Sequence, residues 1–172
     1  MQRRNALTLI ALSTIVPTAV FGRDRARHEE RLEETEERYI EDTLALGDIS
    51  LATSRLAQRN VHHRRVRTFA EYETAEQELI GSLLRSFGGR VPAEAREERR
   101  DEARDLRELR GERFDEAFLD AQAEGHEHLL RVQNEFIKTG RDDDLQTIAK
   151  LIRGRIQEHV DLIQKIRDQL RA

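Results

Sequence analysis

Apolar side chains recur every three or four residues along most of this chain, which is the spacing of amphipathic α-helices. Four long stretches carry such a stripe, and each of them predicts one helix. They cover residues 39–59, 66–87, 112–139 and 142–170. Because the joints between them are short, the pattern predicts an all-α protein folded as an antiparallel up-down-up-down four-helix bundle.

Glycine and proline mark the ends of these stretches. Gly88 and Gly89 close the second one, since glycine adopts the left-handed conformation of a helix end at little cost. Pro92 suits the first turn of an extra short helix, predicted over residues 93–110 between the second and third main helices. Gly111 interrupts that short helix before the third main helix begins.

The first 22 residues differ from the rest and have the composition of a secretory signal peptide. Arg3 and Arg4 give a positive start, residues 6–16 are apolar, and residues 17–22 form a short exit segment. The apolar run is too short for a comfortable transmembrane helix. We therefore expect residues 1–22 to be removed during export to the periplasm or the medium, by the Sec route in preference to the twin-arginine route. No transmembrane span is expected after that removal.

Residues 23–38 are charged on every side, and Leu32 is their one sizeable apolar residue. A segment of this kind cannot bury a face, so it is expected to form either a tether or a solvated helical extension. The bundle domain is accordingly predicted over residues 39–172.

Composition narrows the classes of function. Hydrophobic and charged residues each make up 37% of the 172 residues, and the formal net charge is −4. Removal of residues 1–22 takes away two arginines and no acid, which changes the charge to −6. No net positive field therefore favours binding to nucleic acid. Cysteine is absent, which excludes a thiol nucleophile, a zinc–thiolate site and stabilisation by disulfides.

A few short segments are more distinctive than the helical pattern. They are Leu56-Ala57, Val66-Arg67-Thr68-Phe69-Ala70, Phe114-Asp115 with Phe118 and His126, and Glu158-His159. On these segments, residues 39–170 resemble the domain-of-unknown-function 4142 family, whose members are exported bacterial proteins. The resemblance implies a ferritin-like version of the four-helix bundle.

The chain departs from that family's pattern at three places. Ser50 stands where members typically have a glutamate in the first helix. Glu76-Gln77 replaces an Asp-His pair in the second helix, and Arg153-Gly154 replaces a Leu-Pro pair in the fourth. These departures weaken any ligand set that the resemblance implies.

In ferritin-like metal bundles, carboxylates and Glu-x-x-His pairs point inward from facing helices. This chain has no such pairs at matching points of two helices, and Glu76, His126 and His159 are the best remaining candidate ligands, for iron, copper or zinc. Glu73 lies one turn before Glu76, in a position to act with it. His159 lies on the apolar stripe of its helix, so its ring is expected to face the core. A neutral histidine bonded to Ser50 or Glu76 is favoured there over a metal ligand.

No arrangement typical of an enzyme is found. The chain lacks a glycine-rich phosphate loop, a Ser/His/Asp set and an HExxH zinc motif. Asp115 falls in the first turn of the helix predicted over residues 112–139, where a carboxylate interacts favourably with the positive end of the helix. We therefore expect no catalytic activity.

Two functions remain open. The favoured one is a non-catalytic exported helical-bundle protein that acts through its surface, as a monomer or homodimer, on another protein or a component of the cell envelope, including under stress. The alternative is a degenerate ferritin-like protein that binds a transition metal through Glu76, His126 and His159. Ring nitrogens of the two histidines more than about 6 Å apart, with no shared carboxylate, would exclude a common metal ion.

Overall fold

The structure is a computed structural model that describes residues 19–171, with the side chains of residues 33–171 except 98 and 99. Its five helices are Ala19–Asn60 (α1), Arg64–Ser86 (α2), Ala93–Arg107 (α3), Glu112–Thr139 (α4) and Asp143–Leu170 (α5). The described residues contain no strand, which confirms the predicted all-α class. Of the signal peptide predicted over residues 1–22, residues 1–18 lie outside the described part of the chain.

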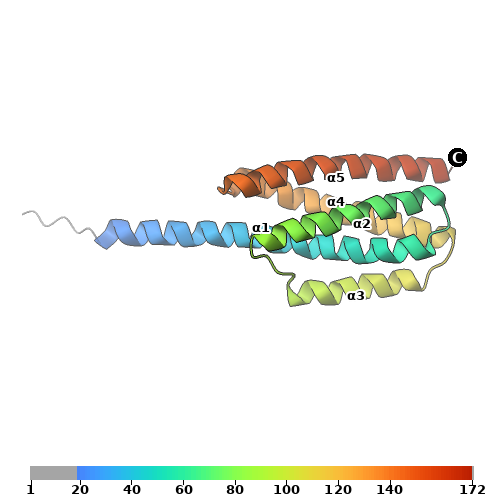
Figure 1. Cartoon of the computed structure of the whole chain (residues 1–172), viewed down its shortest axis with the longest axis horizontal. Helices are drawn as coiled ribbons and strands as arrows, with labels where there is room; N and C mark the ends of the chain where they lie inside the picture. The colour runs from blue at the N-terminus through green and yellow to red at the C-terminus, as the bar shows by residue number, and fades with distance from the viewer. Residues whose placement is uncertain (1–18, 172) are drawn as a thin grey trace, which may run out of the picture.

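Helix α1 is much longer than the others and packs along only part of its length. It continues unbroken through the charged segment 23–38, so that segment is a helical extension rather than a tether. In Figure 1 the first part of α1 projects beyond the other helices. Among the described side chains, burial begins at Tyr39 and Ile40, which are 3% and 6% exposed. The apolar stripe predicted to begin at residue 39 marks this change correctly.

Helix ends follow the sequence signals closely. Gly88 has a φ of 88° after the end of α2, and the amide of Gly89 donates to the carbonyl of Leu84, a closure that only a left-handed residue allows. Gly111, with a φ of 62°, separates α3 from α4. Helix α3 ends at Arg107, three residues before the predicted end at 110, because the amides that follow bond back three residues in tighter turns.

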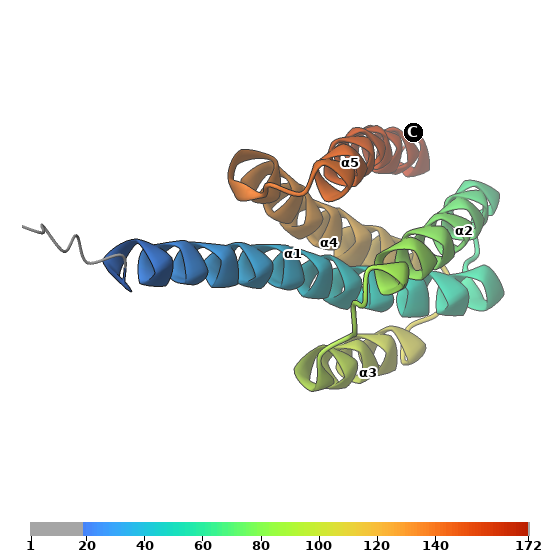
Figure 2. The ribbon, with the colours of Figure 1, turned by 60° about the vertical axis from the view of Figure 1, so that its left-hand side comes forward.

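Helix α1 is the element on which the other helices are assembled. It packs against α2, α3 and α4, and α4 packs in turn against α5. Figures 1 and 2 show α3 lying along α1, on the side away from α5. One apolar cluster surrounds Phe69, Phe114 and Phe118 near the α1–α2 joint. Another surrounds Tyr39 and Phe136, whose rings stack with centroids 3.9 Å apart.

Asp115 ties two parts of the fold together. It lies in the first turn of α4, as predicted, but its side chain is 2% exposed and turns toward the loop between α1 and α2. Its two carboxylate oxygens accept hydrogen bonds from the backbone amides of His62 and His63, at 2.9 and 2.7 Å. Asp115 therefore has two roles: its charge acts on the positive end of its own helix, as expected, and it bonds to the loop residues that precede α2. No local sequence pattern reveals the second role.

None of the described helices combines the length and the apolar character needed to cross a membrane.

Substitution of Asp115 by alanine is expected to destabilise the protein by about 2–4 kcal/mol, because two backbone amides lose a charged acceptor. Urea unfolding followed by circular dichroism measures the change. The control is Asp120→Ala, which removes a carboxylate that is 74% exposed and pairs with Arg167 at the surface. The control is expected to cost less than about 1 kcal/mol. Equal costs for the two variants would contradict the role assigned to Asp115.

Candidate metal centre

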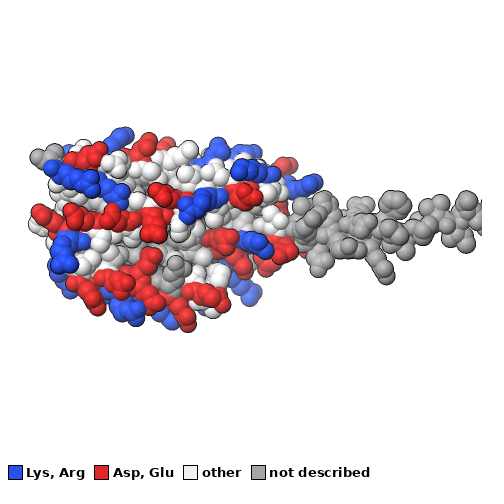
Figure 3. All heavy atoms as spheres, turned by 180° about the vertical axis from the view of Figure 1, so that it is seen from behind, with Lys and Arg blue, Asp and Glu red and all other residues white. Residues whose placement is uncertain are grey.

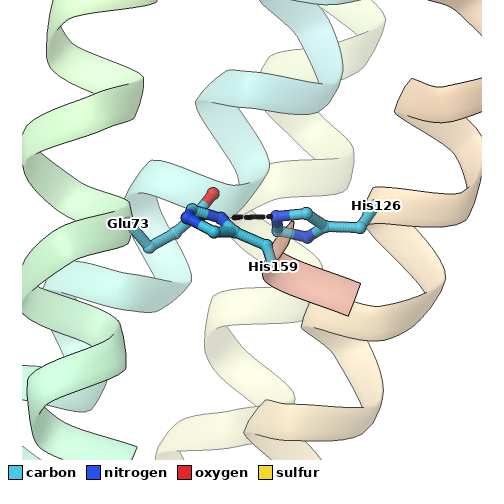
Figure 4. A group of neighbouring side chains, drawn as sticks. All are labelled: Glu73, His126 and His159. Atoms are coloured by element: carbon cyan, nitrogen blue, oxygen red, sulfur yellow. Dashed lines mark hydrogen bonds and ion pairs between the residues drawn. The ribbon is translucent and has the colours of Figure 1, made fainter. Parts of the chain in front are cut away.

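A layer of polar side chains crosses the interior between the two aromatic clusters. At its centre, Glu73 of α2, His126 of α4 and His159 of α5 point toward one another (Figure 4). Their relative exposures are 0%, 1% and 3%. Glu73 is placed there by its helix, since it follows Phe69 at one-turn spacing on the buried face of α2. We call these three residues the buried triad.

The position of His126 fixes which of its ring nitrogens carries the proton. Nδ1 lies 2.7 Å from the carbonyl oxygen of Gln122, one turn earlier on α4. A carbonyl only accepts hydrogen bonds, so Nδ1 is assigned the proton. In a neutral ring, Nε2 then presents its lone pair to the interior, 3.1 Å from Nδ1 of His159 and 3.4 Å from Oε2 of Glu73.

His159 lies between the interior and the surface of the molecule. Its Nδ1 faces the other two members of the buried triad and lies 2.7 Å from Oε2 of Glu73. Its Nε2 faces outward, 3.5 Å from a carboxylate oxygen of Glu76 and 3.3 Å from Nη2 of Arg155. The ring therefore separates the buried carboxylate from a surface ion pair.

The two oxygens of Glu73 are in different situations. Oε1 accepts hydrogen bonds from the hydroxyl of Ser50 at 2.6 Å and from the side-chain amide of Gln77 at 2.9 Å. Oε2 is equally buried, but no donor among the described residues is aligned to it as a hydrogen bond. Its neighbours are the ring nitrogens of His126 and His159, close enough to act on it through their charge. The two imidazoles are therefore the polar groups nearest to the second oxygen of this buried carboxylate.

Electrostatics in the buried triad favours charge separation over neutrality. Burial acts to raise the pKa of Glu73, but the imidazoles of His126 and His159 and the hydroxyl of Ser50 outweigh it and hold that pKa well below its usual range. Burial likewise acts to lower the pKa of His126, and the carboxylate of Glu73 outweighs it and raises that pKa. Without a metal ion, the triad therefore holds a carboxylate and binds a proton at imidazole.

Helix α1 supports the triad without supplying a member. The hydroxyl of Ser50 lies between Oε1 of Glu73 and the side-chain oxygen of Gln122, 2.9 Å away, and its one proton serves only one of them at a time. The amide of Gln122 donates in turn to the hydroxyl of Thr53. At Gly47 the missing side chain makes room for Gln77, since a Cβ there would lie 2.6 Å from the Gln77 side-chain oxygen.

The spacing of the three inward atoms suits a single metal ion. Ligand atoms that lie about 2.1 Å from a metal are about 3.0 Å apart at right angles and about 3.4 Å apart at the tetrahedral angle. The three separations here are 2.7, 3.1 and 3.4 Å. Two imidazoles and one carboxylate are also ligands that first-row transition ions accept.

The structure brings together two of the three ligands chosen from the sequence. The nearest ring nitrogens of His126 and His159 are 3.1 Å apart and share the carboxylate of Glu73, so they satisfy the separation required for a common ion. Glu76 lies outside this group, because its carboxylate accepts two hydrogen bonds from Arg155, at 3.0 and 2.9 Å. Glu73 takes the inner place. Its position on the stripe of Phe69 and Ala70 was the signal that could have identified it.

Comparison with known proteins gives one match. The family model described as Domain of unknown function (DUF4142) matches residues 22–166. No curated protein and no solved structure matches the chain.

The charge state of the triad predicts how the stability of the metal-free protein depends on pH. The lowered pKa of Glu73 contributes stability above its unfolded value of 4.5, and this is lost as the pH falls through the folded pKa. The raised pKa of His126 contributes stability below 6.5, and this is lost as the pH rises through the folded pKa. The contribution of the pair is therefore greatest between pH 4.5 and 6.5.

Urea unfolding in the presence of a chelator, at about pH 5.5 and about pH 9, tests this dependence. The wild-type protein is expected to lose more stability between these pH values than His126→Gln. His128→Gln, which changes an exposed histidine two residues away on α4, should keep the wild-type dependence. The assignment fails if His126→Gln and His128→Gln lose stability alike.

Proposed function

The chain belongs to the family Domain of unknown function (DUF4142), and we propose that it binds one divalent transition-metal ion through Glu73, His126 and His159. The family assignment names no activity. The proposal therefore rests on the interior of the protein and not on its relatives.

The observation that carries the proposal is the convergence of three potential ligand atoms, one from each residue of the buried triad. Oε2 of Glu73 is negative, buried and without an aligned donor. When His126 is neutral, its Nε2 turns a lone pair toward this oxygen, because the one proton of the ring is engaged with the carbonyl of Gln122. Electron-pair donors that converge this closely in a buried site are stabilised by a cation among them, which is either a proton or a metal ion. A proton satisfies one pair of atoms at a time, whereas a metal ion satisfies all three together.

The chemistry of the donors narrows the choice of metal. Two imidazoles and one carboxylate bind zinc in catalytic zinc sites and iron(II) in non-haem sites, and both leave a coordination position for an exchangeable ligand. Copper(I) prefers thiolate and thioether sulfur, and the chain contains no cysteine. Copper(II) does accept imidazole and carboxylate ligands, so the donor set disfavours copper(I) and leaves zinc, iron(II) and copper(II) as candidates among the metals suggested by the sequence.

The sequence favoured a protein that acts through its surface over a metal-binding protein. The proposed function now places metal binding first. On the face shown in Figure 3, acidic and basic side chains are interspersed rather than gathered by sign. The interior carries the more specific feature, a set of three converging ligands from three helices.

Two finer expectations belong to the same proposal. We infer that α1, α2, α4 and α5 form an antiparallel up-down-up-down bundle of the ferritin-like kind, which is supported by the packing of α1 on α2 and α4 and of α4 on α5. We also propose export to the periplasm or the medium, which is supported by the positive and apolar pattern of residues 1–22.

Metal binding to the stripped protein tests the proposal directly. Zinc titration by calorimetry, with cobalt(II) absorbance as a spectroscopic readout, is expected to give one ion per chain. Glu73→Gln, His126→Gln and His159→Gln should each weaken binding by about 100-fold or more, since each removes one of three ligands. Zinc should also raise the melting temperature of the wild-type protein alone, because an ion bound only to the folded state stabilises it.

Two matched variants separate ligands from neighbours. His128→Gln removes an exposed imidazole close to His126 and should leave the affinity unchanged. Glu76→Gln removes the carboxylate beside Nε2 of His159 and should weaken binding by about tenfold at most, because Glu76 orients the ring without touching the ion. A stoichiometry of zero, or triad variants that bind as well as the wild type, would refute the proposal.

A further inference from the structure

We infer that the metal ion reaches the buried triad through a small pocket between α1, α3 and α4, whose acidic rim collects the cation. This inference rests on the proposed function, and it concerns the route to the site rather than its ligands. The triad residues are at most 3% exposed, so an ion must pass other side chains to reach them.

The approach between α2 and α5 is closed to a cation. The guanidinium of Arg155 lies across it, held on Glu76 by two hydrogen bonds and 3.3 Å from Nε2 of His159. Arg155 also pairs with Glu158, so a network of three paired side chains stands in front of the outer face of His159. The imidazole ring of His159 then stands between Arg155 and the inward oxygen of Glu73.

Apolar layers close both directions along the helix axes. On one side, Phe69 is 1% exposed and its ring lies with its centroid 5.5 Å from that of His159 and 6.4 Å from that of His126. On the other side, the next turns of α4 and α5 carry a buried cluster of Leu129, Ile152 and Ile156. An ion has no ligands to exchange its hydration shell for in either layer.

The approach between α1 and α2 is too narrow. A cavity there reaches Gln77, but its volume is only about 10 Å³, which is at the lower limit for one water molecule. The guanidinium of Arg85 also lines it.

One further approach is lined by polar side chains and has more room. A pocket of about 70 Å³ lies between α1, α3 and α4, large enough for several water molecules. Ser50, Thr53 and Gln122 line its inner part, and the hydroxyl of Ser50 is 2.6 Å from Oε1 of Glu73. Oxygen atoms of these side chains can replace water around a passing ion. The pocket therefore ends one side chain away from the triad.

The outer part of this pocket carries the charge expected of a cation entrance. Glu102 of α3, with Glu124 and His128 of α4, lines it. Glu124 and His128 are four residues apart and so lie on the same face of α4. Negative groups around a low-dielectric cleft raise the local concentration of cations and speed their association. The approaches at Arg155 and Arg85 each carry an arginine together with acids, whereas the charged lining of this pocket is glutamate beside one histidine.

Gly125 gives a way to block this route without altering a ligand. It lines the pocket, and a Cβ added there would meet nothing within 4 Å, so a larger side chain would extend into the open space. Gly154 of α5 is the matched control, because it is also helical with open space around it but lines none of the approaches described above. Both substitutions replace glycine within a helix and carry the same gain in helix propensity.

The experiment measures the rates of cobalt(II) binding and of its removal by a chelator, together with the equilibrium affinity. Gly125→Leu is expected to slow binding and removal by the same factor, about tenfold, and to leave the affinity unchanged, since a blocked passage raises the barrier alone. Gly154→Leu should match the wild type. Glu102→Gln and Glu124→Gln should slow binding severalfold at low salt and less at high salt.

The outcomes separate the route from the function. If the wild-type chain binds no metal, the proposed function fails. If it binds metal but Gly125→Leu leaves both rates unchanged, the route is wrong. Faster binding by Arg155→Gln, with Gly125→Leu unaltered, would place the entrance between α2 and α5 instead.

Discussion

The carboxylate of Glu73 is the constraint around which this interior is arranged. A charged group with no exposure has lost its hydration, and each of its oxygens needs a partner inside the protein. Ser50 and Gln77 provide donors to one oxygen, and the two imidazoles of the triad lie beside the other. These partners come from α1, α2, α4 and α5, so a single buried charge requires all four helices to be in register.

The buried charge of Glu73 explains the positions of several residues that take no direct part in the site. Gly47 leaves space for Gln77 to reach the carboxylate. Gln122 holds His126 through its backbone oxygen and shares the hydroxyl of Ser50 through its side chain. Arg155 and Glu76 form an ion pair over the outer face of His159, which limits how its ring can turn. The supporting groups therefore fix orientation, while the triad holds the three converging ligand atoms.

Local sequence patterns predicted the helices and their ends well, but they predicted the residues of the candidate site only in part. Glycines at 88 and 111 act within one turn of themselves, so the sequence reveals them. The pairing of His126 with His159 spans 33 residues and depends on how two helices pack. Whether Glu73 or Glu76 lies in the buried triad depends on which face of α2 meets α4 and α5. The bond from Asp115 to the loop at His63 is tertiary in the same way.

A second buried polar layer shows why the triad, rather than any interior polar group, is assigned a ligand. The hydroxyl of Tyr39 donates to the side-chain oxygen of Gln133, and the amide of Gln133 donates to the hydroxyl of Thr43. Burial raises the pKa of Tyr39, so the hydroxyl keeps its proton and remains a donor. This layer is neutral, and the side-chain donors of Tyr39 and Gln133 have acceptors within it, which is sufficient for a structural role. The layer at Glu73 has the same depth and similar helices around it, yet it leaves a negative oxygen without an aligned donor. A fold that needed only register would be served by a second neutral layer, so the charge at Glu73 supports the proposal that the triad binds a metal cation.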